Sequence, residues 1–347
     1  MSTDGQPRLE LLRAKRQGLR VALAVTVGLC TGLVMGDILP FLAPLFATQF
    51  LLTSRRAPAL RQGLITVLVV ILTGALLVGA TGLLGERPWV LLPLLWLFYF
   101  ICFTAQGRQL GGAGPALMLV IAIAVPMLDI VQRDLGESIV LLLAKAICLG
   151  LLLTWGAHAL LPDPAGEQAD DLLVPAHEPA LVIRQAMASA AILLAMVALC
   201  LSDPRLATAM VVPITVASLL SQFSLGMSSR AALGMVMVNL LGGVVASLAF
   251  TLFELRPTLW MVALILLLVS LLFAGKAAMG NTTGKVFGGG LITFLILFGL
   301  GVSPLPTETP EVFSTRIAYV LFAIVYAIGL ATLLWPRPKA VGRVMAG

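Results

Sequence analysis

Residues 41–64 read FLAPLFATQFLLTSRRAPALRQGL, and residues 208–235 read TAMVVPITVASLLSQFSLGMSSRAALGM. Each passage begins apolar with a proline, continues into hydroxyl and glutamine side chains, and reaches an arginine. Pro44 and Pro213 are 169 positions apart (213 − 44), and the same offset relates other residues of the two halves: Arg61 and Arg230, Gly74 and Gly243, Arg87 and Arg256, Pro88 and Pro257. One offset without a gap indicates an internal duplication.

The composition predicts an all-α, polytopic membrane protein. Of the 347 residues, 60% are hydrophobic and only 11% are charged, and the mean hydropathy is +1.06. A soluble domain cannot bury that much apolar surface. Apolar runs of about 18 residues or more recur along the chain, which is the pattern of membrane helices. A β-barrel is disfavoured because its strands would alternate apolar and polar residues.

The apolar runs predict about twelve spans in two six-helix repeats. The first repeat covers 18–161 after a cytoplasmic lead-in at 1–17, and the second covers 181–336 before a tail at 337–347. A polar, acidic stretch at 162–180 reads as a linker. The expected spans are 18–37, 39–54, 62–84, 88–105, 114–131, 138–161, 181–201, 206–223, 231–254, 257–275, 286–302 and 315–335. Six spans per repeat give both copies the same orientation, so the axis relating them should run along the membrane normal.

The basic residues predict that both termini are cytoplasmic. With that orientation five arginines fall outside, at positions 87, 133, 205, 256 and 316, and Lys145 lies within a span. The other sixteen of the 22 lysines and arginines lie inside, as the positive-inside rule requires. The net charge of +6 therefore reflects membrane topology, and we expect no nucleic-acid partner.

Little in the sequence favours enzyme chemistry. Only His158 and His177 are present, the carboxylates fall at span ends or in loops, and no HExxH, GxSxG or Walker pattern occurs. The four cysteines lie in apolar runs without pairing or CxxC spacing. We expect a non-enzymatic protein with no cofactor and no metal.

The short second and eighth spans carry the first candidate binding residues. Short, proline-interrupted spans at matching places in two halves indicate a transport site. The candidates for substrate binding are Thr48, Gln49, Thr215, Ser218 and Gln222. In the alternative interpretation, these side chains only hydrogen-bond between helices or to their own backbone.

Cations supply further candidates. Lys145 stands about two turns into its span, where it could attract a carboxylate substrate or extend to the outer interface. Asp37 is the outer-edge acid of the first span. Loops rich in glycine or arginine on the cytoplasmic side provide candidates for a cationic mouth: Arg61, Arg108, Arg230, Lys276 and Asn281. These loop cations could equally be ordinary positive-inside charges.

The passage RRAPALRQGLITVLVVILTGALLVG at 55–79 resembles the fusaric-acid-resistance and aromatic-acid-exporter superfamily, in which an arginine-bearing loop leads into a glycine-spaced span. Arg61, Gly63, Gly74 and Gly79 carry the resemblance, with Arg230 and Gly243 in the second half. Larger members have a sizeable cytoplasmic domain between the halves, so this chain resembles a compact branch. The resemblance implies efflux of aromatic or other organic acids from a bacterial inner membrane, beside a periplasmic adaptor of the membrane-fusion type.

Two alternatives stay open. A major-facilitator-like transporter also has twelve spans in two parallel halves, but the loop TSRRAPALRQG lacks the acidic residue of that family's signature. A membrane scaffold that anchors an adaptor without transport is disfavoured by the short loops. The expected partners are therefore small organic anions, an adaptor protein and the lipid bilayer, and the sequence leaves open whether the chain forms a homo-oligomer.

Overall fold

The computed structural model describes residues 5–54, 56–110, 112–131, 136–162, 179–202, 211–222, 229–279, 282–303 and 313–334. These ranges hold twelve α-helices and no strand, which confirms the all-α prediction. In the first half they are α1 (Gly5–Val34), α2 (Leu42–Thr53), α3 (Leu60–Leu84), α4 (Pro88–Gly107), α5 (Gly114–Val131) and α6 (Gly136–Leu160). In the second half they are α7 (Pro179–Ser202), α9 (Val211–Gln222), α10 (Ser229–Leu255), α11 (Leu259–Ala277), α12 (Thr282–Val302) and α13 (Phe313–Leu334).

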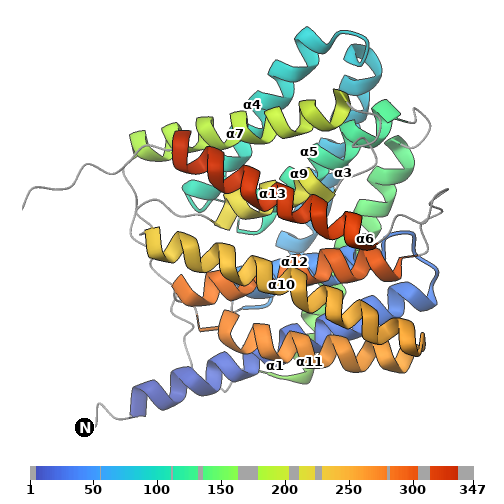
Figure 1. Ribbon diagram of the computed structural model, residues 1–347, viewed down its shortest axis with the longest axis vertical. Helices are drawn as coiled ribbons and strands as arrows, with labels where there is room; N and C mark the ends of the chain where they lie inside the picture. The colour runs from blue at the N-terminus through green and yellow to red at the C-terminus, as the bar shows by residue number, and fades with distance from the viewer. Residues whose placement is uncertain are drawn as a thin grey trace, which may run out of the picture.

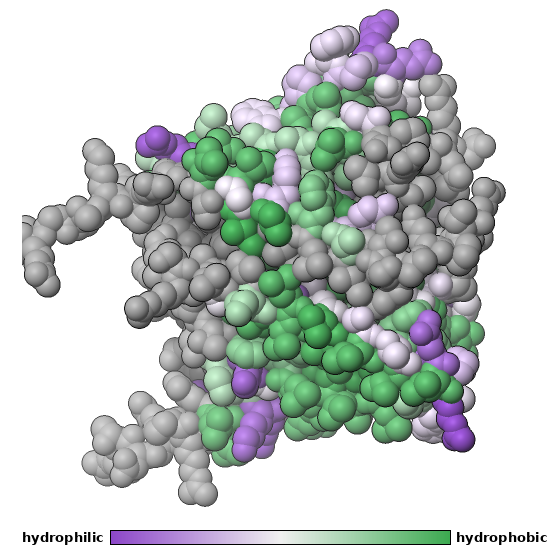
Figure 2. All heavy atoms as spheres, viewed as in Figure 1, coloured by the Kyte–Doolittle hydropathy of each residue, from purple (hydrophilic) through white to green (hydrophobic). Residues whose placement is uncertain are grey.

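The chain is a multi-pass membrane protein. Seven helices in the described ranges are long and apolar enough to cross a bilayer, namely α1 from Leu11 onward, α3, α4, α6, α7, α10 and α11. Large apolar side chains project outward from them; on α3, Leu64, Leu68, Leu72 and Leu76 are all exposed. Figure 2 shows hydrophobic residues over the middle of the visible face and hydrophilic residues toward its edges. This distribution suits a protein surrounded by lipid.

Helix α1 begins earlier than the sequence indicated. The expected lead-in at 1–17 is helical from Gly5 and continuous with the first span. No proline or glycine pair interrupts the stretch Leu9–Gln17, so the helix continues through these polar residues.

Helices α2 and α9 correct the interpretation of the two prolines. Pro44 and Pro213 are each the third residue of a helix, so they do not interrupt a span. The first turn of a helix has no backbone acceptor for its N–H groups, so proline there removes no hydrogen bond. Each helix therefore starts later than expected and has 12 residues. At a rise of 1.5 Å per residue it is about 18 Å long, shorter than the hydrocarbon core of about 30 Å.

The first helix of each half packs against the fourth helix of the other half. Helix α1 lies along α11, and α7 lies along α4. Figure 1 shows α1, α10, α11 and α12 side by side in one layer, with α4 and α7 together at the opposite end of the view. The two halves therefore interlock, and α2, α5, α9 and α12 lie at the contact between them.

Glycines permit the closest of these approaches. A Cβ atom added at Gly18 of α1 would lie 2.9 Å from the Cα atom of Gly275 in α11. A Cβ atom added at Gly242 of α10 would overlap the carbonyl oxygen of Gly290 in α12. Small residues at such crossings let two backbones approach within a membrane, where van der Waals packing drives helix association.

We predict that Gly242→Ala lowers thermal stability, because the new methyl group would meet backbone atoms of α12. Overpacking of this kind costs about 1–3 kcal/mol. The measurement is the melting temperature of the purified protein in detergent. Gly243→Ala is the matched control, because its new Cβ atom would meet only the Leu297 side chain at 3.6 Å. Equal melting temperatures for the two variants would contradict the prediction.

Candidate functional site

A buried cation ties three helices of the first half together at one end. Arg20 of α1 is 2% exposed. Its Nε atom donates a hydrogen bond to the carbonyl oxygen of Leu161 (3.0 Å), and a terminal guanidinium nitrogen donates to the same oxygen. Its other terminal nitrogen donates to Gln17 Oε1 (3.0 Å), and the Gln17 amide donates to the carbonyl oxygen of Leu51.

These hydrogen bonds satisfy backbone carbonyl groups at the C-terminal ends of α2 and α6. Leu161 directly follows the last residue of α6, and Leu51 is in the last turn of α2. Terminal carbonyl groups have no partner within their own helix and carry the negative end of the helix dipole. A guanidinium fork placed against them supplies both hydrogen bonds and positive charge. From the sequence, Arg20 is one of the sixteen basic residues expected on the cytoplasmic side. The pattern that could have indicated its buried contacts is an arginine three residues after a glutamine, immediately before the apolar run VALAV.

Two polar pairs join helices at membrane depth. The hydroxyl of Thr81 in α3 is hydrogen-bonded to a carboxylate oxygen of Asp129 in α5, and both residues are buried. In the second half the hydroxyl of Thr293 in α12 donates to Asn239 Oδ1 in α10 at 2.7 Å. Asp129 lies near the end of its span, as expected for the carboxylates, but its burial was not foreseen.

The predicted binding residues of α2 and α9 occupy varied surroundings. The hydroxyl of Thr48 is buried and donates to the carbonyl oxygen of Pro44 at 2.8 Å, the backbone bond of the alternative interpretation. Gln49 and Ser218 are half-buried, and Thr215 is buried. Gln222 ends α9, and its side chain lies outside the described residues.

The predicted cytoplasmic cations lie at helix ends. Arg61 in the first turn of α3, Arg108 just after α4, and Lys276 in the last turn of α11 are exposed. The Lys276 ammonium lies 4.7 Å from the ring centroid of Phe287, which gives it a cation–π contact. Asn281 and the side chain of Arg230 lie outside the described residues.

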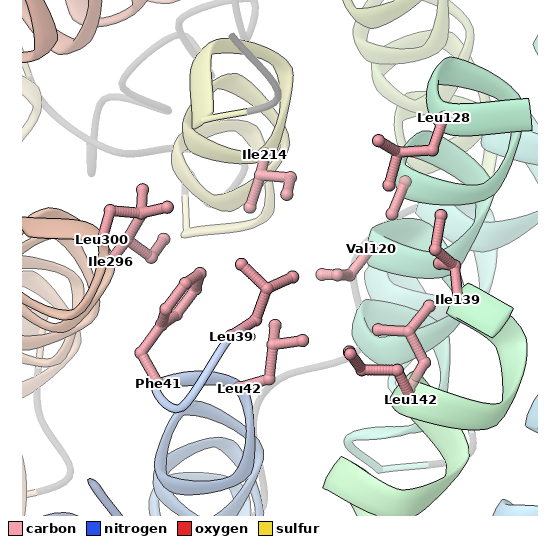
Figure 3. Close-up of a pocket in the computed structure, with 12 residues that line it drawn as sticks. Leu39, Phe41, Leu42, Val120, Leu128, Ile139, Leu142, Ile214, Ile296 and Leu300 are labelled. Carbon is pink, nitrogen blue, oxygen red and sulfur yellow. The ribbon is translucent and has the colours of Figure 1, made fainter. Parts of the chain in front are cut away.

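An apolar cavity lies where the two halves meet (Figure 3). Its volume is about 40 Å³, and all of its lining side chains are apolar. The lining residues come from the α1–α2 turn and helices α2, α5, α6, α9 and α12: Leu39, Phe41, Leu42, Val120, Ala124, Leu128, Ile139, Leu142, Leu143, Ile214, Ile296 and Leu300. Helices α2 and α9 both reach this cavity, but through residues near their first turns and not through the predicted polar residues.

An ion pair joins two of the segments that line this cavity, the α1–α2 turn and α6. Lys145 of α6 binds the Asp37 carboxylate in the α1–α2 turn. The next residue, Ile38, accepts a hydrogen bond through its carbonyl oxygen from Ser303, just after α12. The charged and polar contacts therefore tie the α1–α2 turn to one helix of its own half and to one of the other half.

Comparison with known families matches each half of the chain separately. Residues 17–155 match a family model described as a protein of unknown function (DUF2955). Residues 190–330 match the model described as fusaric acid resistance protein-like. Residues 190–330, the second half of the chain, are therefore similar to the fusaric acid resistance proteins. The resemblance drawn from the sequence is thereby confirmed, and the match indicates a membrane transporter of the fusaric acid resistance type.

No curated protein and no solved structure matches the chain. Among the residues that the structure describes, no group of three or more histidine, cysteine or acidic side chains is placed to hold a metal ion.

We predict that Arg20→Ala destabilises the protein, because the carbonyl oxygen of Leu161 at the end of α6 loses its donor and Gln17 loses its hydrogen bond to the guanidinium group. A lost partner of this kind costs about 1–3 kcal/mol. Thermal unfolding in detergent should show a clearly lower melting temperature. Arg16→Ala removes an exposed arginine one turn earlier and should change the melting temperature little. A variant pair with the same melting temperature would show that the Arg20 contacts contribute nothing.

Proposed function

We propose that the protein exports aromatic or other organic acids across a bacterial inner membrane, together with a periplasmic adaptor of the membrane-fusion type. One observation carries the proposal beyond the family match: the α1–α2 turn and α6, which both line the apolar cavity between the halves, also carry the ion pair of Asp37 with Lys145. An aromatic carboxylic acid has the same two parts, an apolar ring and an anionic group. The present volume of about 40 Å³ is smaller than the roughly 150 Å³ of an apolar cavity that binds benzene, so the lining helices would have to separate to admit the ring. A lysine could then compensate the charge.

Two parallel repeats are part of this proposal, and the packing supports them. Helix α3 packs on α5 as α10 packs on α12, and α2 packs on α6 as α9 packs on α13. The contact of α1 with α11 has its counterpart in the contact of α7 with α4. The cavity is lined by the matched helices α2 and α9 and the matched helices α5 and α12. A substrate site at the repeat interface is the usual arrangement in transporters built from repeats.

The proposed route starts at the cytoplasmic cations and ends at the cavity. The exposed residues Arg61, Arg108 and Lys276 would raise the local concentration of anions at the inner mouth. Gln49 on α2 and Ser218 on α9 would then offer hydrogen bonds along the way. The ion pair of Asp37 with Lys145 would stand near the outer end.

The first test of this function is the accumulation of radiolabelled fusaric acid and benzoate in cells that express the chain with its presumed adaptor. We predict lower accumulation than in cells without the chain, and no effect on neutral benzamide. Gln49→Ala should weaken export about ten- to a hundredfold in apparent affinity, because the acid loses a half-buried hydrogen-bond donor. Gln62→Ala removes an exposed glutamine of α3 and serves as the control. If the intact protein changes the accumulation of no organic acid, the proposed function is wrong.

The orientation has a separate test. Reporter domains fused after Leu161 and after Pro336 should both report the cytoplasm, because the basic residues gather on that side. A fusion after Leu84, at the end of α3, should report the periplasm. A periplasmic signal from either of the first two fusions would contradict the orientation.

A further inference from the structure

The ion pair of Asp37 with Lys145 lies below the outer end of α6. Arg20 of α1 donates a hydrogen bond to the carbonyl group of Leu161, just after α6, so these two residues lie at about the same height along the two helices. This contact is the reference from which the positions of Asp37 and Lys145 are measured. Lys145 is 16 residues from Leu161 along α6, and Val34 is 14 residues from Arg20 along α1. At 1.5 Å per residue, the two positions are about 24 Å and about 21 Å from that level. Helix α6 begins at Gly136 and so continues about 13 Å beyond Lys145.

The two segments that form the pair also line the apolar cavity. Leu39, two residues after Asp37, lines the cavity, and so does Leu142, one helical turn before Lys145. Figure 3 shows Leu39 and Leu142 with their side chains in this space. A carboxylate has no partner among the twelve lining side chains, whereas the lining helix α6 carries a cation, Lys145. An anion beside apolar walls without such a partner would be costly.

The two members of the pair differ in accessibility. The Lys145 side chain is 52% exposed, whereas the Asp37 side chain is 20% exposed. Lysine carries three rotatable donors on a flexible chain. The ammonium group can therefore meet a second carboxylate while its present partner stays in the α1–α2 turn.

We propose that Asp37 and the carboxylate of the exported acid compete for Lys145. The incoming anion displaces Asp37, its ring enters the apolar cavity as the lining helices separate, and the return of Asp37 to Lys145 releases the anion outward. The lysine stays paired with a carboxylate at each stage, and the displaced Asp37 carboxylate, which has lost its partner, drives the return. This inference rests on the proposed export of organic acids and adds a residue that binds the acid and a residue that expels it.

A purely structural role for the same pair makes a different prediction. If the ion pair only fastens the α1–α2 turn to α6, removing either member breaks the same bond, and Asp37→Asn and Lys145→Gln should act alike. If the acid competes with Asp37, the two changes should act in opposite directions on acid affinity. Asp37→Asn removes the competitor, whereas Lys145→Gln removes the cation that both carboxylates need.

The experiment measures binding of radiolabelled benzoate and of neutral benzamide to the purified full chain in lipid nanodiscs, alongside export in cells. Asp37→Asn should bind benzoate about tenfold more tightly, and Lys145→Gln about tenfold more weakly, as expected for one charge-assisted hydrogen bond. Benzamide binding should not change in either variant. Asp37→Asn should also slow export at saturating benzoate, because release loses its displacing group.

Two further variants serve as controls. Lys145→Arg keeps the charge and should keep the preference for benzoate over benzamide. Arg87→Gln removes an exposed cation on the same predicted side and should leave benzoate binding unchanged.

The outcomes separate this inference from the function on which it rests. If the wild type exports acids but Asp37→Asn and Lys145→Gln shift benzoate affinity in the same direction, the competition for Lys145 is wrong and the proposed export is unaffected. The same holds if Lys145→Gln keeps its preference for benzoate. If the wild type neither binds benzoate nor changes the accumulation of any acid, both the proposed function and the competition for Lys145 are wrong.

Discussion

A helix that ends against other helices leaves its last carbonyl groups with few water partners, and those groups must be satisfied by the protein. In this chain the requirement falls on Arg20 and Gln17, which donate to the carbonyl groups of Leu161 and Leu51. The contact fixes the ends of α2 and α6 at the level of Arg20 on α1. The position of the α1–α2 turn then follows from helix length, and so does the level at which Asp37 meets Lys145.

The interlocked first helices make the two halves depend on each other. Because α1 packs on α11 and α7 packs on α4, neither half can bury its own first helix without the other. Such an arrangement holds the halves together at their sides. It leaves the cavity at the centre, where the short helices α2 and α9 meet α5, α6 and α12. A transporter needs such a combination, since the site must change its access while the assembly stays intact.

In the proposed function, the apolar cavity and the ion pair of Asp37 with Lys145 would divide the recognition of an organic acid into two parts. Apolar walls accept a ring of varied shape, because dispersion and hydrophobic contacts are not directional. A single lysine selects for negative charge without fixing the geometry as an arginine fork would. A family of exported acids with different rings would therefore be compatible with one site.

The sequence by itself determined the class of the protein and nearly all of its helices. Uninterrupted apolar runs can only be helices in lipid, so the ends of α3, α4, α5 and α12 fell within a few residues of their expected positions.

The tertiary structure alone decided which polar residues are buried. Arg20 and Asp129 look like span-end charges in the sequence, because burial depends on which helices pack against them. Only the structure shows where a proline lies within its helix. A proline in the first turn is compatible with the helix, whereas a proline in the interior interrupts it. The apolar cavity and the pairing of Asp37 with Lys145 join residues more than a hundred positions apart, and only the packing of the helices brings them together.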